Sequence, residues 1–176
     1  MRFTSILLVS LAVSSAALMA ESAAGISWTA PAGWKAQAPR PMRAATYSIA
    51  PVAGDSTGAE CIVNYFGPGQ GGGVDANIER WKGQVQGPDG RPAVGKIEKR
   101  TVRNVPITIF DSSGSYAGMG GPMAAASKPV PGYRLLGAIV EGPGGTVFFK
   151  LTGPARTIAA QQKNLDQLLA SIQIQK

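Results

Sequence analysis

The order of the β-rich runs and helical segments constrains the fold of this chain most. Runs rich in β-forming residues occur at 26–29, 44–49, 59–66, 95–103, 105–112, 133–140 and 146–152. One amphipathic helix is expected between the third and fourth runs, and a second closes the chain. Short glycine-containing links, such as residues 54–58 and 141–145, favour hairpins. We therefore expect an α+β domain with a mainly antiparallel sheet flanked by helices, an α/β/α sandwich.

The two helices are predicted from their apolar stripes. In the first, helical spacing joins Val74, Ile78, Trp81 and Val85, and residues 87–90 are expected to end it. In the second, residues 155–172, the buried side is expected to hold Ile158, Leu165, Leu168, Leu169 and Ile172.

The N-terminus has the order of a secretory signal peptide. Arg2 precedes a short apolar run that passes into small residues. The run is shorter than the roughly 20 apolar residues that span a bilayer. Cleavage fits after Ala20 or after Ala24, and the smaller residues before Ala24 favour the second. We expect residues 1–24 to be a signal peptide and 25–176 to form one soluble domain in the periplasm or outside the cell, not an integral membrane protein.

The chain contains no histidine and one cysteine, Cys61. The lack of histidine excludes histidine-based triads, cysteine–histidine pairs and most zinc and copper sites. One cysteine cannot form an internal disulfide, so stability must come from packing. Cys61 shares a strand face with Val63 and Tyr65, which favours a buried thiol over an intermolecular disulfide or a reactive thiol. With no catalytic residue set, we expect a non-enzymatic protein without cofactor or metal.

The net charge is +7, and it stays at +7 without residues 1–24 because Arg2 and Glu21 leave together. A basic exported protein is attracted to anionic surfaces such as lipid headgroups, cell-wall polymers or acidic proteins. Export makes nucleic acid a poor candidate. We therefore expect an envelope protein or an anionic surface as partner.

One basic cluster stands out, on the predicted strand 95–103. Strand alternation places Lys96 and Arg100 on one face and Lys99 and Arg103 on the other. A charged edge strand that prevents sheet-to-sheet aggregation is the simpler interpretation, and a surface for an anionic partner is the alternative.

A long loop at residues 117–132 is rich in glycine, alanine, methionine and proline. Met119 and Met123 in this loop favour an adaptable apolar contact surface or lid, with copper(I) binding as a weaker alternative. These two methionines, together with the basic cluster, form the predicted binding surface.

A glycine-rich segment, G-P-G-Q-G-G at residues 67–72, matches G-x-G-x-x-G between a strand and a helix. Dinucleotide binding would require a parallel sheet, and the lysine of a phosphate loop is absent. A flexible linker is favoured, and anion binding by amides at the helix start is the alternative.

Both ends of the domain resemble a known group of proteins. The segment W-T-A-P-A-G-W at residues 28–34 resembles the opening of the PsbP-like and DcrB-like families, and residues 147–154 and 168–172 resemble their ends. The chain is also similar to uncharacterised secreted bacterial proteins. The resemblance implies an antiparallel sheet covered by helices on both faces and an accessory or binding role. No functional residue of those families maps onto this sequence.

These observations predict an exported accessory or binding protein of the cell envelope. The alternative is a small-ligand or lipid-binding protein with a pocket under the 117–132 loop. A histidine-free hydrolase would require a serine such as Ser112 or Ser113 beside a lysine, and no spacing in the sequence indicates this.

Overall fold

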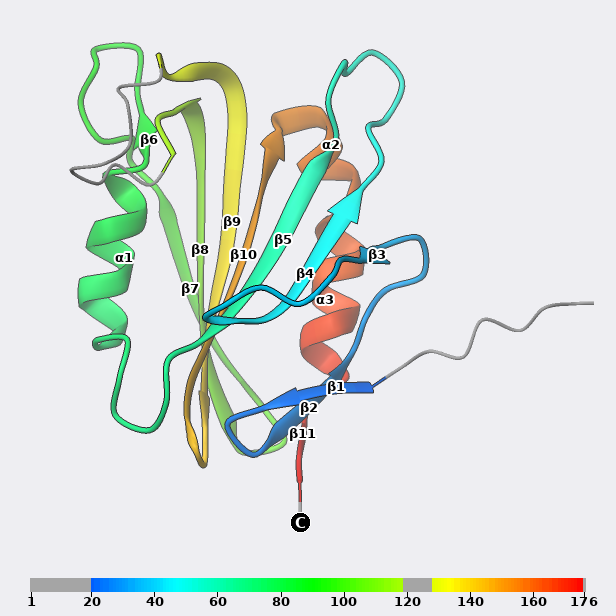
Figure 1. Ribbon diagram of the computed structural model, residues 1–176. Helices are drawn as coiled ribbons and strands as arrows, with labels where there is room; N and C mark the ends of the chain where they lie inside the picture. The colour runs from blue at the N-terminus through cyan, green and yellow to red at the C-terminus, as the bar shows by residue number, and fades with distance from the viewer. Residues whose placement is uncertain (1–19, 119–127, 176) are drawn as a thin grey trace, which may run out of the picture.

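The computed structural model describes residues 20–118 and 128–175 (Figure 1). Its main feature is an eight-stranded sheet in the order β3-β4-β5-β10-β9-β8-β6, with β7 paired to β8. The strands of this sheet are β3 (Lys35–Ala36), β4 (Arg43–Ile49), β5 (Ala59–Tyr65), β6 (Val85–Gln86), β7 (Lys96–Val102), β8 (Val105–Tyr116), β9 (Val130–Gly142) and β10 (Gly145–Pro154). A small second sheet joins β1 (Ala20–Ala23), β2 (Ile26–Thr29) and β11 (Gln173–Ile174). Pairings between the described strands are antiparallel.

Helices pack on both faces of the large sheet (Figure 1). The helices α2 (Ala155–Ala160) and α3 (Gln162–Ala170) share the larger core, and α1 (Val74–Lys82) shares a smaller one on the other face. Side chains of β10 alternate between them, with Phe149 in the larger core and Phe148 in the smaller. The predicted α+β sandwich is therefore confirmed.

The helix α1 covers only part of its face. Its buried Ile78 and Trp81 pack with Phe110, Leu135 and Phe148, which belong to β8, β9 and β10. The strands β4 and β5 carry no helix on this face, and the segment between β3 and β4 crosses in front of the sheet instead (Figure 1). Residues 41–43 of this segment and residues of α1 line a common pocket, described below.

The structure differs from the prediction in the end of the first helix and in the continuity of the second. The first ends at Lys82, and Val85 lies in β6, where it pairs with Tyr116. Gly83 follows the helix, and glycine is a weak helix former, so pairing with β8 prevails from there. The second is interrupted at Gln161, although all of its expected buried residues are at most 1% exposed.

Predicted hairpins account for most of the sheet. The links 54–58 and 141–145 join antiparallel pairs, as expected. Between β7 and β8, Arg103 and Asn104 both have positive φ, 45° and 65°, as a two-residue hairpin turn requires. The strands β3, β6 and β11 were not expected, since runs of two residues carry no readable period, and β1 lies in the segment expected to be the signal peptide.

Residues 20–24 take part in this fold. The strand β1 pairs with β2 along its whole length, and Glu21 accepts a hydrogen bond from the buried hydroxyl of Tyr47. The carbonyl of Ala24 accepts a 2.8 Å hydrogen bond from the amide of Gly144. Among the described residues, no helix is long and apolar enough to cross a membrane.

Candidate functional site

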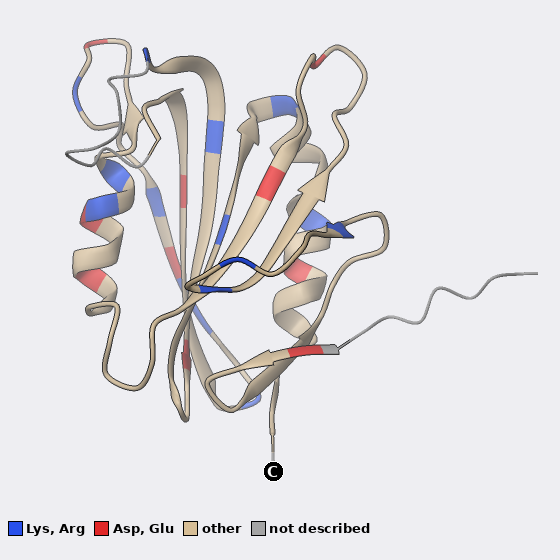
Figure 2. Cartoon of the chain, viewed as in Figure 1, with Lys and Arg blue, Asp and Glu red and all other residues tan. Residues whose placement is uncertain are grey.

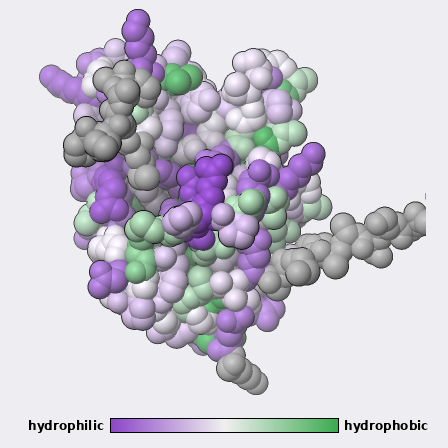
Figure 3. Space-filling view, viewed as in Figure 1, coloured by the Kyte–Doolittle hydropathy of each residue, from purple (hydrophilic) through white to green (hydrophobic). Residues whose placement is uncertain are grey.

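A pocket of about 270 Å³ opens between α1 and the turn at residues 41–43. The end of β5, the inner side of α1 and two residues of β10 complete its walls. Its volume lies slightly below the roughly 300–1,000 Å³ of typical ligand sites. Figure 3 shows apolar and strongly hydrophilic side chains next to each other on this side of the molecule. The pocket likewise has both apolar and charged side chains in its lining.

Lys150 is the unusual residue of this pocket. It lies in β10 between Phe149 and Leu151, and strand alternation turns it to the α1 face with Phe148. Lys150 is 6% exposed, and its ammonium donates a 3.2 Å hydrogen bond to Oε1 of Gln84. Burial, aided by the positive charge of Arg43 and opposed by Glu60, lowers the pKa of Lys150 to about 8. At neutral pH this is a mostly charged group in a poorly solvated place, which favours binding of an anion.

Two arginines add positive charge at the rim. Arg43 donates to Oγ1 of Thr46 at 3.3 Å and to Oε1 of Glu60 at 3.4 Å. Arg80 on α1 donates to Oδ1 of Asn77 at 2.8 Å. Among the described residues that line the pocket, three are cationic and none is acidic. The site therefore offers hydrogen-bond donors to a negatively charged ligand.

The rest of the wall is apolar. Phe66 and Phe148 pack with ring centroids 5.8 Å apart, and Phe66 is still 36% exposed. Met42 is 69% exposed, with φ of 62°. Met42 follows Pro41 in a turn that is closed by a hydrogen bond from the amide of Arg43 to the carbonyl of Arg40. Glycine or asparagine is usual at the position that Met42 occupies. Met42 therefore presents an exposed apolar side chain at the rim of the pocket.

The glycine-rich segment at residues 67–72 contacts two residues that line this pocket, Asn77 and Phe148. The side-chain nitrogen Nδ2 of Asn77 donates to the carbonyls of Gly71, Gly72 and Gly73 at 2.9, 3.2 and 2.9 Å. A side chain at Gly71 would meet the ring of Phe148. Since the neighbouring strands are antiparallel and carbonyls converge here, the segment is a hydrogen-bonded connection that orients α1, not a dinucleotide loop.

The predicted basic cluster on β7 separates into two parts. Arg100 forms an ion pair with Asp166 of α3 at 3.0 Å, and Arg103 donates to the carbonyls of residues 170 and 172 at 2.7 and 2.8 Å. Arg103 was expected on the face of Lys99, but it follows the end of β7 in a turn and reaches α3. Lys96 and Lys99 remain exposed. Basic and acidic residues alternate over the strands and helices in Figure 2.

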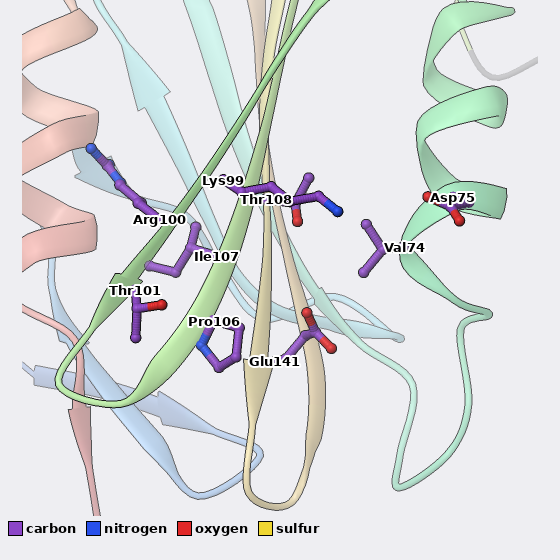
Figure 4. A pocket seen from close by; sticks show the side chains of 9 residues that line it. All are labelled: Val74, Asp75, Lys99, Arg100, Thr101, Pro106, Ile107, Thr108 and Glu141. Atoms are coloured by element: carbon purple, nitrogen blue, oxygen red, sulfur yellow. The ribbon is translucent and has the colours of Figure 1, made fainter.

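Lys99 borders a groove of about 410 Å³ between α1 and the strands β7 and β8 (Figure 4). In this view Lys99 and Thr108 point toward α1, whereas Arg100 points to the opposite side of the strands. Asp75 and Glu141 also line the groove, so positive and negative charges are mixed there. It lacks the uniform charge of the Lys150 pocket.

A third hollow, of about 350 Å³, lies between β7 and α3, and the ion pairs of Arg134 with Asp111 and of Arg100 with Asp166 line it. Arg134 binds both carboxylate oxygens of Asp111 at 2.7 Å and donates to Gln162 at 2.8 Å. The hydrogen bond to Asp111 raises the pKa of Arg134 above its usual range. Because these groups satisfy one another, their role is to join the sheet to the helices.

The remaining predicted residues form no site. Cys61 is fully buried, and burial raises the pKa of its thiol well above the usual range, which supports the interpretation as a core residue. Ser112 is buried with no hydrogen-bond partner among the described residues, and Ser113 is exposed. The described part of the chain contains no cluster of acidic or cysteine side chains that could hold a metal.

The structure describes residues 117–118 and 128–132 of the predicted loop, and β9 already begins at Val130, inside its expected bounds. Met119 and Met123 lie outside the described residues. At the base of the loop, the rings of Tyr116 and Tyr133 stack with centroids 5.9 Å apart. The loop's described residues do not line the Lys150 pocket.

Sequence reasoning overlooked Lys150, although one signal was available. The apolar run from Val147 to Leu151 is interrupted by this single charge. Such a run is typical of a strand buried on both faces, where a lysine is rarely placed without a partner. The neighbours that make it a pocket come from segments far apart in sequence.

Comparisons with known proteins support the fold alone. No protein-family model matches the sequence, and no curated protein matches it significantly. The solution structure of cyanobacterial PsbP (CyanoP) from Synechocystis sp. PCC 6803 is similar over 96% of this chain and 98% of that one, with a TM-score of 0.54 and 13% identity. Protein PA94 from Pseudomonas aeruginosa, of unknown function, is similar over 87% and 94%, with a TM-score of 0.49 and 12% identity. The chain therefore has a PsbP-like fold, an antiparallel sheet with helices on both faces.

Proposed function

We propose that this chain is an exported, non-enzymatic binding protein of the cell envelope, and that the Lys150 pocket is its ligand site. The observation that carries the proposal is the buried ammonium of Lys150 in a pocket whose described lining residues include two arginines and no acid. A charge in such a place costs free energy in the absence of a counterion, so a bound anion would recover that cost.

A binding role is favoured over catalysis by the residues themselves. The chain has no histidine to act as general base. Its cysteine is buried, and the hydroxyl of Ser112 has no activating partner among the described residues. Of the described residues of the predicted surface, Lys96, Lys99 and Arg103 are exposed, and Arg103 already donates hydrogen bonds at the end of α3.

Export is supported by the predicted signal peptide, and the fold bears on where it ends. A cut after Ala24 would remove β1, the hydrogen bond from Tyr47 to Glu21, and the acceptor for Gly144. A cut after Ala20 removes only the first residue of β1 and keeps Glu21–Ala23, the hydrogen bond from Tyr47 to Glu21 and the acceptor for Gly144. We therefore propose Ala20 as the cleavage position, although the residues before Ala24 are smaller.

N-terminal sequencing and intact mass of the protein from the periplasm or the medium test this part. We expect a mature chain that starts at Glu21. A chain that starts at Gly25 would contradict the proposed position, and a chain found only in the cytoplasm with residue 1 intact would contradict export.

Native mass spectrometry of the protein purified from envelope extracts tests the ligand site. We expect the wild type to retain a small ligand that Lys150→Met loses. The matched control is Lys163→Met, which removes an exposed lysine of α3 and should keep the ligand. Equal ligand occupancy in all three proteins would show that Lys150 does not form the site.

A further inference from the structure

We infer that the Lys150 pocket binds a small monocarboxylate with an apolar tail, its carboxylate on Lys150 and its tail toward Met42 and Phe66. The inference rests on the proposed function, because it assigns a chemical class to the ligand of the same site.

The charges of the pocket select the head group. Lys150 uses one hydrogen bond on Gln84, so its ammonium has further donors, and Arg43 and Arg80 add guanidinium donors at the rim. Glu60 already pairs with Arg43 and lies outside the lining. One deeply buried cation is balanced by one negative charge, which a carboxylate supplies in a form that accepts several hydrogen bonds.

The apolar wall selects the tail. Phe148 and Trp81 are 4% and 5% exposed, while Phe66 and Met42 are 36% and 69% exposed, so the wall opens from the interior toward the rim. The volume of about 270 Å³ equals that of roughly nine water molecules at about 30 Å³ each, so a ligand of roughly nine or ten non-hydrogen atoms matches it in size. An aliphatic chain of about the length of octanoate fills this space, and it would bury the exposed Met42 side chain.

The test is a titration of the purified protein with sodium octanoate, followed by NMR of the methionine methyls and tryptophan indoles. Sodium acetate carries the head without the tail, and 1-octanol carries the tail without the charge. We expect saturable octanoate binding that shifts the signals of Met42 and Trp81. Acetate and octanol should each bind at least about tenfold more weakly, since charge-assisted hydrogen bonds and apolar burial each contribute about this factor or more.

Two variants report on the two halves of the site. Lys150→Met should weaken octanoate at least about tenfold and leave octanol unchanged, while Lys163→Met should match the wild type. Met42→Gly is compatible with the backbone at this turn, so it should fold and weaken octanoate but not acetate.

Other outcomes overturn the inference in distinguishable ways. Acetate binding as tight as octanoate would mean a simple anion site, and octanol binding as tight would mean an apolar site without charge recognition. If octanoate fails to bind while the purified protein retains a Lys150-dependent ligand of another class, the inference fails and the proposed function stands. If the retained ligand does not depend on Lys150, the proposed site itself fails.

Discussion

Replacing Lys150 with methionine should reveal what the buried charge costs the free protein. The pKa of Lys150 falls from 10.5 to about 8 on folding, mainly because burial disfavours the charged form. At about 1.4 kcal/mol per pH unit, folding with the lysine charged costs about 3 kcal/mol. Methionine has a similar length and no charge. The variant also leaves Oε1 of Gln84 without its donor, which costs about 1–3 kcal/mol.

The pH dependence separates these two effects, because only the charge cost changes with pH. Below pH 8 both the folded and the unfolded chain hold the proton on Lys150, and the full cost is present. Between pH 8 and 10.5 the folded chain releases this proton while the unfolded chain keeps it, so wild-type stability rises relative to the variant. The advantage of Lys150→Met should therefore shrink by about 2 kcal/mol between about pH 6.5 and about pH 9.5.

Urea unfolding at the two pH values, followed by tryptophan fluorescence, measures this change. Lys163→Met, on the exposed side of α3, should show no pH-dependent difference from the wild type. If the free-energy difference between Lys150→Met and the wild type is the same at both pH values, Lys150 pays no desolvation cost. The argument that the pocket favours an anion would then be refuted.

Three further predictions concern the packing of α1, its hydrogen-bonded connection and the larger core. Gly137→Ala places a methyl group against the indole of Trp81, so it should lower the unfolding free energy by about 1–3 kcal/mol, and an unchanged urea midpoint would contradict the packing of α1. Asn77→Ala leaves the carbonyls of Gly71 and Gly72 without the side-chain donor, while the carbonyl of Gly73 keeps the hydrogen bond from the backbone amide of residue 77; we expect a loss of about 2 kcal/mol and faster hydrogen exchange in residues 71–76. Cys61 should react with an aromatic disulfide reagent only after unfolding, and rapid reaction of the native protein would contradict its burial.

Local patterns in the sequence were sufficient for most of the fold. Alternation over 44–49 and 59–66, and glycine in the link between them, predict a hairpin because both signals depend on neighbouring residues only. The same holds for the apolar stripe of 155–172, whose expected members are all buried. The length of the first helix was predicted wrongly because Val85 is buried in either conformation, and pairing with β8 decides between them.

The candidate site could not be predicted in the same way. The ion pair of Arg100 with Asp166 and the hydrogen bonds of Arg103 to the end of α3 join residues more than 60 positions apart. Strand alternation assigns these side chains to a face, but it does not say which helix covers that face. Arg100 and Arg103 of the predicted basic cluster therefore bind α3 and its end, and Lys96 and Lys99 do not.

The sequence by itself determined the antiparallel character of the sheet, the two amphipathic helices and the burial of Cys61, because these follow from local period and residue type. Only the tertiary structure decided that Lys150 would lie in a pocket. The pairing of β10 with β5, and the packing of α1 over β10, bring Gln84 and Arg43 to this lysine from 66 positions away and more. A charge acquires its cost and its partners from the chain segments that exclude water around it, and those contacts are long-range.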